Sequence, residues 1–230
     1  MKKHPYSRNS FPQKLHVSGY IQEYSHGVQS ALNEVPVNAI EKALLTLQRG
    51  MKKGAHIYVG GNGGSSAIAS HLCCDFITAS HLPGKQNGLK VHSLNEVPLF
   101  TAFANDYGYK HSLSKQIQMM SGQGDILILI SSSGNSPNIV KAALKAKRLG
   151  LTVIGLTGFN GGRLRNIADV SLHVPLQNYG MIEDSHQMLM HVLAQILYLR
   201  RRKERKHRAS LGKSLPIDQG DTKSRTELIT

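Results

Sequence analysis

Residues 125–136 have the sequence DILILISSSGNS, in which an apolar run is followed by four serines, a glycine and an asparagine. The run has no polar residue after Asp125, so it predicts a β-strand that is buried on both faces, as in the interior of a parallel sheet. Residues 137–149 are expected to form a helix, because Gly150 is a typical residue just past a helix end. This strand, loop and helix indicate an α/β fold.

The same alternation continues on both sides of this segment. Short β-rich or apolar runs predict further strands, at 55–60, 91–94, 152–156 and 170–174. Helices are expected at 65–79, 109–121 and 183–202, and over 19–50, where apolar residues recur every three or four positions and Pro36 marks a break. Such alternation is typical of a doubly wound parallel sheet covered by helices on both faces. We therefore expect this sheet, with N-terminal helices before it and a long C-terminal helix after it.

The length of 230 residues fits one domain with a sizeable core. We expect an irregular basic segment at 1–18, the folded domain at 19–203 and a disordered tail at 204–230. The net charge of +14 belongs mainly to the ends, since residues 1–20 carry four Lys or Arg and no acid, and residues 200–230 carry ten against four. The basic run 200–206 could attract nucleic acid or an anionic membrane, or be a helix end that suits the helix dipole. We favour the helix end and expect no nucleic-acid partner, although the basic tail leaves one open.

Several features favour a cytoplasmic protein without a membrane partner. No apolar run approaches the roughly 18–20 residues that span a bilayer, and no apolar segment of a secretory signal follows the basic N-terminus. Cys73 and Cys74 are the only cysteines, and adjacent cysteines seldom bridge each other, which fits a reducing compartment. Core packing is the favoured role for both cysteines, because cysteine is among the most buried residue types.

Two loops follow predicted strands and precede predicted helices, which is where open parallel sheets bind ligands. The first is Gly60-Gly61-Asn62-Gly63-Gly64-Ser65, where glycines let a ligand approach the backbone closely. The second is Ser131–Ser136, where four hydroxyls and several amides can converge on one anion. A plain tight turn is the alternative for the first loop, and a helix-capping cluster for the second. Because four serines in six residues exceed what capping needs, we expect the second loop to bind phosphate.

These loops carry a resemblance to a known family. The chain resembles the SIS (sugar isomerase) domain family, on motifs at 61–65, 105–108, 131–136 and 156–162. The order and spacing of the motifs are most similar to the phosphoheptose isomerases, which convert sedoheptulose 7-phosphate to a heptose 7-phosphate. The resemblance implies a five-stranded parallel sheet flanked by helices, and a homotetramer with its sites at subunit interfaces.

The resemblance also implies roles for individual residues. Phosphate binding would fall to Ser131, Ser133 and Ser136, and contacts to the sugar to Asn62, Ser65 and Asp106. We add Gly63, Ser132 and Glu183 to the residues expected to bind the sugar phosphate.

A metal site is expected on two helices. His71 and Asp75 are four residues apart and share a helix face, while Glu183 and His191 lie within about 80° of each other in projection. Two histidines and two carboxylates could bind zinc, although a His–Asp pair at this spacing can also be an ordinary helix pair. The phosphoheptose isomerases place His, Glu, Gln and His at these positions and bind zinc there. This chain keeps both histidines and has Asp75 in place of Glu and Glu183 in place of Gln.

We expect aldose–ketose isomerisation, which moves a proton between adjacent carbons through an enediol and needs one base and one acid. Asp75 is the expected base and His191 the expected acid, each also a possible zinc ligand. The alternative is a non-catalytic protein, because the chain also resembles a SIS-family protein that binds the bacterial replication initiator and lacks the catalytic residues. A third class, a sugar-phosphate-sensing regulator, would add a DNA-binding domain for which the first 20 residues are too short.

Overall fold

The structure is a computed structural model that describes residues 9–81 and 88–212. Its sheet has five parallel strands in the order β2-β1-β3-β4-β5. The strands are β1 (His56–Gly61), β2 (Lys90–Ser93), β3 (Ile126–Ser131), β4 (Thr152–Thr157) and β5 (Val170–His173). The predicted α/β fold with a five-stranded parallel sheet is therefore confirmed, and each strand lies within a residue or two of its predicted position.

Strand β3 lies in the middle of the sheet and is buried along its whole length. Ile126, Ile128 and Ile130 pack into the apolar core on one face of the sheet. Leu127 and Leu129 pack into a second core on the other face. The uninterrupted apolar run is thus explained by two cores, because successive side chains of a strand point to opposite faces.

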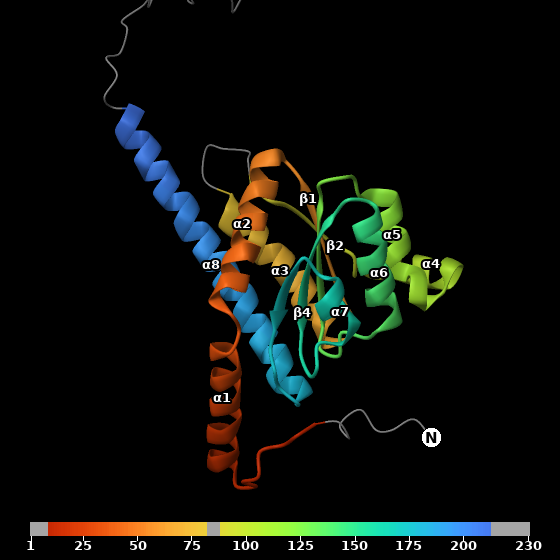
Figure 1. Cartoon of the computed structure of the whole chain (residues 1–230), viewed down its shortest axis with the longest axis vertical. Helices are drawn as coiled ribbons and strands as arrows, with labels where there is room; N and C mark the ends of the chain where they lie inside the picture. Colours follow the sequence, from red (N-terminus) through yellow and green to blue (C-terminus); the bar gives the residue numbers. More distant parts are fainter. Residues whose placement is uncertain (1–8, 82–87, 213–230) are drawn as a thin grey trace, which may run out of the picture.

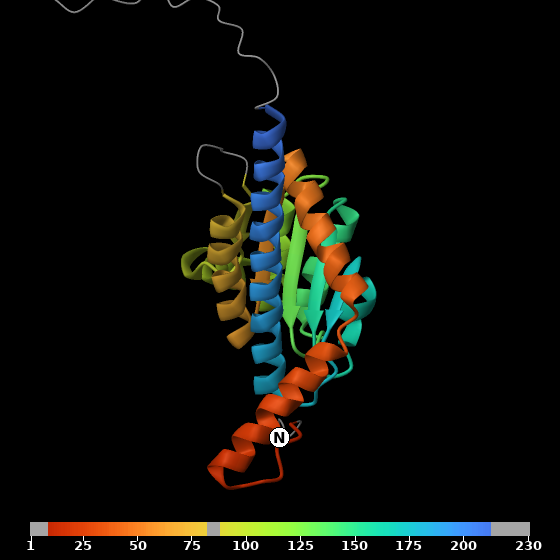
Figure 2. The ribbon, with the colours of Figure 1, turned by 90° about the vertical axis from the view of Figure 1, so that its left-hand side faces the viewer.

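Helices cover both faces (Figure 1). The first core is completed by side chains from α2 (Val37–Lys53), α3 (Gly64–Ser80) and α8 (Tyr179–Gly212). The second is completed by α5 (Ser112–Met120), α6 (Pro137–Arg148) and α7 (Gly162–Ile167). Figure 2 shows α8 lying between α2 and α3, while α1 (Val17–Asn33) extends beyond the sheet.

The structure differs from the sequence prediction at several helices. Helix α4 (Val97–Tyr107) was not predicted. None of its residues is fully buried, and only Phe100 packs partly against the second core. The short helix α7 was also missed. Helix α1 begins at Val17, inside the segment expected to be irregular, and the break near Pro36 is confirmed.

The last helix is longer than expected at both ends. It begins at Tyr179 and continues to Gly212, so residues 204–212 are helical although we assigned them to the tail. The basic run contains Arg, Lys, Glu and Ala, which favour helix, and meets no glycine or proline before Gly212. Residues 213–230 and 1–8 lie outside the described part of the chain.

The strand order reverses between β1 and β3, because β2 lies outside β1 and the later strands lie outside β3. Gly61 at the end of β1 pairs with Ile130 near the end of β3. The two loops singled out in the sequence therefore leave the sheet side by side, at the switch point where doubly wound sheets bind ligands. No helix among the described residues is long and apolar enough to cross a membrane.

His186 on α8 is fully buried, and burial lowers its pKa to about 4. An unfolded histidine has a pKa of about 6.5. Between these values the unfolded chain binds a proton that the folded chain does not, so stability falls as the pH falls from about 6.5 to 4. Burial gives this side chain a structural role.

We expect the free energy of unfolding to decrease between pH 7 and pH 5 by on the order of 2 kcal/mol through His186 alone. A His186→Gln variant does not titrate in this range, so its stability should depend less on pH. Thermal unfolding of both proteins at the two pH values measures the difference. An equal loss in wild type and variant would contradict this prediction.

Candidate functional site

The serine loop turns tightly out of β3. Gly134 adopts the left-handed conformation with φ of 61°, and its amide donates to the Ser131 carbonyl at 3.0 Å and to Ser131 Oγ at 3.2 Å. The Asn135 amide donates to Ser133 Oγ at 3.3 Å. A Cβ atom at position 134 would lie 2.0 Å from the carbonyl oxygen of Gly161. Both the turn and the close neighbour therefore require glycine here.

A second segment, at residues 158–164, holds the serine loop through hydrogen bonds from its backbone. The Gly158 amide donates to the Ser132 carbonyl, and the Leu164 amide to the Gly134 carbonyl, each at 2.9 Å. The Arg163 amide donates to Asn135 Oδ1 at 3.0 Å. The Leu-Thr-Gly-Phe-Asn-Gly-Gly motif at 156–162 and the first turn of α7 thus hold the serine loop through backbone amides.

The glycine loop after β1 is fixed by side-chain amides. Asn62 and Asn138 exchange two hydrogen bonds, of 2.9 and 2.8 Å, and the Tyr109 hydroxyl donates to Asn62 Oδ1 at 2.8 Å. Asn95 likewise accepts from the Gly61 amide at 3.0 Å and donates to its carbonyl at 2.9 Å. Asn62 therefore ties the glycine loop to α6, the helix that follows the serine loop.

Both loops open into one pocket of about 140 Å³. Its lining brings together most of the residues predicted to bind the sugar phosphate: Asn62, Ser65, Ser131, Ser132, Ser133, Ser136 and Glu183, with Ile130 and Tyr179. Of the other two predicted residues, Gly63 adjoins the pocket as the N-cap of α3 but does not line it. Asp106 is exposed near the end of α4, where it accepts a hydrogen bond from Asn105, and this chain alone does not bring it to the pocket.

The pocket offers uncharged hydrogen-bond donors. Ser132 Oγ is buried and has no hydrogen-bond partner among the described residues. Ser136 is the N-cap of α6, but its side chain makes no capping bond. Ser65 lies in the first turn of α3, so the positive ends of two helices face the pocket. Unpaired hydroxyls and two helix N-termini are the features that bind phosphate without a metal.

Glu183 is the only acidic residue lining the pocket. Burial, followed by the nearby charge of Asp184, raises the pKa of the Glu183 carboxyl group. A Cβ atom at Gly64 would lie 2.4 Å from Glu183 Oε2, so the first residue of α3 leaves the space that this carboxyl group fills. Glu183 therefore belongs to the pocket that the serine loop lines.

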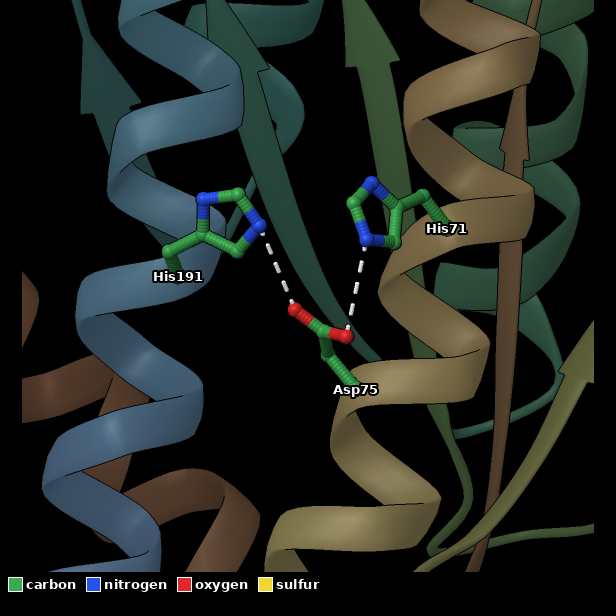
Figure 3. Close-up of side chains that lie close together, drawn as sticks. All are labelled: His71, Asp75 and His191. Atoms are coloured by element: carbon green, nitrogen blue, oxygen red, sulfur yellow. Dashed lines mark ion pairs between the residues drawn. The ribbon is translucent and has the colours of Figure 1, made fainter.

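A second cluster lies farther along α3 and α8 (Figure 3). Asp75 Oδ1 lies 3.5 Å from His71 Nε2, and Asp75 Oδ2 lies 3.4 Å from His191 Nε2. One potential ligand atom from each residue lies within 4.8 Å of the other two. The side chains are partly open to solvent, with exposed fractions of 49% for His71, 30% for Asp75 and 41% for His191.

The distances in this cluster fit a metal better than they fit direct hydrogen bonds. Hydrogen bonds between nitrogen and oxygen are normally about 2.9 Å long. Two ligands about 2.1 Å from a tetrahedral ion lie about 3.4 Å from each other. Two imidazoles and one carboxylate also match the three protein ligands of catalytic zinc sites, which keep one position open. The residues present therefore fit a zinc ion.

Glu183, expected as the fourth ligand, is not part of this cluster in the structure. The projection of the helix placed it near His191 in angle but ignored the rise of about 12 Å over eight residues. The group that reaches the histidines is the side-chain amide of Gln187, which we did not predict. Gln187 Nε2 lies 2.8 Å from His71 Nδ1 and 3.3 Å from His191 Nε2. The sequence could have indicated Gln187, because a residue four positions before His191 lies on the same face of the helix.

Neither cysteine joins the cluster. Cys73 is buried in the first core, where burial raises the pKa of its thiol to about 12, while Cys74 is exposed. No disulfide links them. Core packing is thus confirmed for Cys73 and was wrong for Cys74, which occupies the outer face of α3.

Comparison with known proteins agrees with the fold and the loops. The SIS domain family matches residues 20–158, more than half of the chain. The chain therefore belongs to the SIS domain family.

Similar relatives narrow the class further. The phosphoheptose isomerase of Burkholderia mallei is 36% identical over 163 residues, 67% of this chain and 82% of that protein. That of Aneurinibacillus thermoaerophilus is 32% identical over 190 residues, 79% of this chain and 93% of that protein. A phosphoheptose isomerase structure from Francisella tularensis superposes with a TM-score of 0.72 at 30% identity, covering 80% of this chain and 96% of that one. Within the family, the chain groups with the phosphoheptose isomerases.

The position of Glu183 predicts an effect of its charge on phosphate binding. At pH 8, Glu183→Gln should bind an alditol phosphate such as sorbitol 6-phosphate about three- to ten-fold more tightly than wild type, because it removes a carboxylate beside the bound anion. The gap should narrow as the pH is lowered toward 5.5, because the raised pKa of Glu183 lets its carboxyl group take up a proton at a higher pH than an ordinary glutamate does. Calorimetry at the two pH values tests this. Weaker binding by the variant at pH 8 would show that the carboxylate contributes to binding.

Proposed function

We propose that this chain is a sugar-phosphate aldose–ketose isomerase that interconverts sedoheptulose 7-phosphate and a heptose 7-phosphate in surface-polysaccharide synthesis. The observation that carries the proposal is that a phosphate-type pocket and a cluster of two histidines and a carboxylate lie along the same two helices. Ser65 and His71 are six residues apart on α3, a rise of about 9 Å. This rise is comparable with the summed length of the six C–C bonds, of about 1.5 Å each, in an extended seven-carbon chain. A phosphate held by the serines would therefore leave the carbonyl end near the cluster.

Asp75 and His191 supply the proton transfers. With its phosphate held in the pocket, the sugar presents C1 and C2 to the cluster. There the Asp75 carboxylate removes a proton from one of these carbons. His191 gives a proton to the carbonyl oxygen, which yields the enediol. Asp75 then returns its proton to the adjacent carbon, while His191 takes the proton of the other hydroxyl group, which becomes the new carbonyl group. Two protons leave the substrate and two return, so it is neither oxidised nor reduced overall.

We propose that the ion held at the cluster is zinc, with His71, Asp75 and His191 as its ligands. When bound, it would polarise the carbonyl group and so make the neighbouring carbon acid stronger. Asp75 and His191 would then serve alternately as ligands and as base and acid, because a carboxylate that binds a metal is a weaker base and an imidazole nitrogen that binds a metal carries no proton.

The assembly is proposed as a cytoplasmic homotetramer. The helix that carries the cluster, α8, has exposed apolar side chains, among them Met188 at 48%, Val192 at 41% and Leu199 at 57%. Their spacing places them on one face of the helix. A second subunit covering this face would bury them and bring further residues, such as Asp106, toward a site. Light scattering of the purified protein measures the number of subunits.

One observation favours a second candidate, a non-catalytic sugar-phosphate-binding protein, which could bind a partner such as a replication initiator. Asp75 is one methylene shorter than the glutamate of the phosphoheptose isomerases, and a base misplaced by about 1 Å can lose on the order of a hundredfold in rate. The two histidines argue against this candidate, because binding phosphate alone does not need them.

The reaction can be tested directly with sedoheptulose 7-phosphate and zinc, with product detected by NMR. We expect turnover by wild type, none by His191→Ala, and faster turnover by Asp75→Glu if the shorter carboxylate limits the rate. His26→Ala, on the exposed face of α1, is the control for loss of a histidine. No product from wild type or from Asp75→Glu would favour the non-catalytic candidate.

Phosphate binding by the serine loop has a separate test. Ser133→Ala removes a hydroxyl group that lines the pocket, so affinity for sorbitol 6-phosphate should fall by roughly 1.5–3 kcal/mol. Calorimetry measures this without turnover, since an alditol has no carbonyl group. Unchanged affinity would rule out Ser133 as a phosphate ligand.

A further inference from the structure

Gln187 contacts both histidines of the cluster. Its side-chain nitrogen lies 2.8 Å from His71 Nδ1, on the edge of the ring away from Asp75. The same nitrogen lies 3.3 Å from His191 Nε2. Gln187 is half-buried between α3 and α8, so its amide group bridges the two helices that carry the cluster.

The chemistry of imidazole makes this contact consequential. A neutral histidine carries its proton on only one ring nitrogen, and only the other nitrogen can bind a metal. Metal-ligating histidines usually donate their second N–H to an oxygen, which fixes both the tautomer and the orientation of the ring. At His71, Nε2 faces Asp75 and Nδ1 faces Gln187.

The Gln187 amide can satisfy either tautomer of His71. With its NH₂ group toward Nδ1, as placed here, it donates a hydrogen bond, and Nε2 carries the proton toward Asp75. Rotated by half a turn about its terminal bond, the amide presents its oxygen and accepts from Nδ1–H. Nε2 then has a free lone pair on the side of Asp75 and His191.

We propose that Gln187 is a positioning residue of the metal site, which orients the His71 ring and accepts a hydrogen bond from Nδ1–H when Nε2 binds the metal. The inference rests on the proposed zinc-binding function, and it deepens that function by adding a residue that touches no substrate. It assigns to Gln187 a role that Glu183 does not have, because Glu183 faces the phosphate pocket.

The test measures metal affinity without activity. Zn²⁺ affinity of the full chain is obtained by competition with a chromophoric chelator, and Co²⁺ binding by visible absorption. Gln187→Leu keeps the approximate size of the side chain but removes the amide, so Zn²⁺ affinity should fall by about 10–100-fold. Gln187→Glu retains an acceptor for Nδ1–H and should keep or raise the affinity.

Gln195→Leu is the matched control, since Gln195 is exposed on the same helix two turns farther on. It should bind Zn²⁺ as wild type does. Wild-type affinity in Gln187→Leu, or equal losses in Gln187→Leu and Gln187→Glu, would overturn the positioning role while leaving the zinc site standing. A wild-type protein that binds neither Zn²⁺ nor Co²⁺ would overturn the zinc site and the positioning role together.

Discussion

The burial of β3 on both faces is the constraint from which the rest of the structure follows. A strand with Ile126, Ile128 and Ile130 on one face and Leu127 and Leu129 on the other must lie inside a sheet covered by helices on both sides. It therefore takes the central position, and its end at Ser131 lies beside the end of β1. This placement brings the serine loop to the point where the strand order reverses, which is where doubly wound sheets usually bind ligands.

The sequence predicted structure correctly wherever the arrangement of apolar residues indicates burial. It predicted all five strands and the helices with apolar stripes, and its two loops do line one pocket. The sequence does not predict helix α4, which has no buried residue, or the end of α8, where the high charge is also typical of a disordered tail. The end of α8 has a composition that favours helix, whereas α4 is marked only by the partly buried Phe100 against the second core.

The cluster shows a different limit of sequence reasoning. His71, Asp75 and His191 were predicted together, and they do converge. Glu183 and Gln187 both lie on the side of α8 that faces α3, so angle alone could not choose between them. Which of them reaches the histidines depends on how far α8 is shifted along α3, a quantity set by packing between the helices.

Helix α8 joins the pocket to the cluster without interruption. Tyr179 and Glu183 lie at the pocket, and Gln187 and His191 follow within the next two turns. An α-helix has a fixed rise of about 1.5 Å per residue, so the separation of the two places cannot adjust to the ligand. For the proposed isomerase, the fixed separation along α3 and α8 would select substrates by the length of their carbon chain. A five-carbon sugar phosphate anchored in the serine loop would fall about two C–C bonds, or roughly 3 Å, short of the cluster.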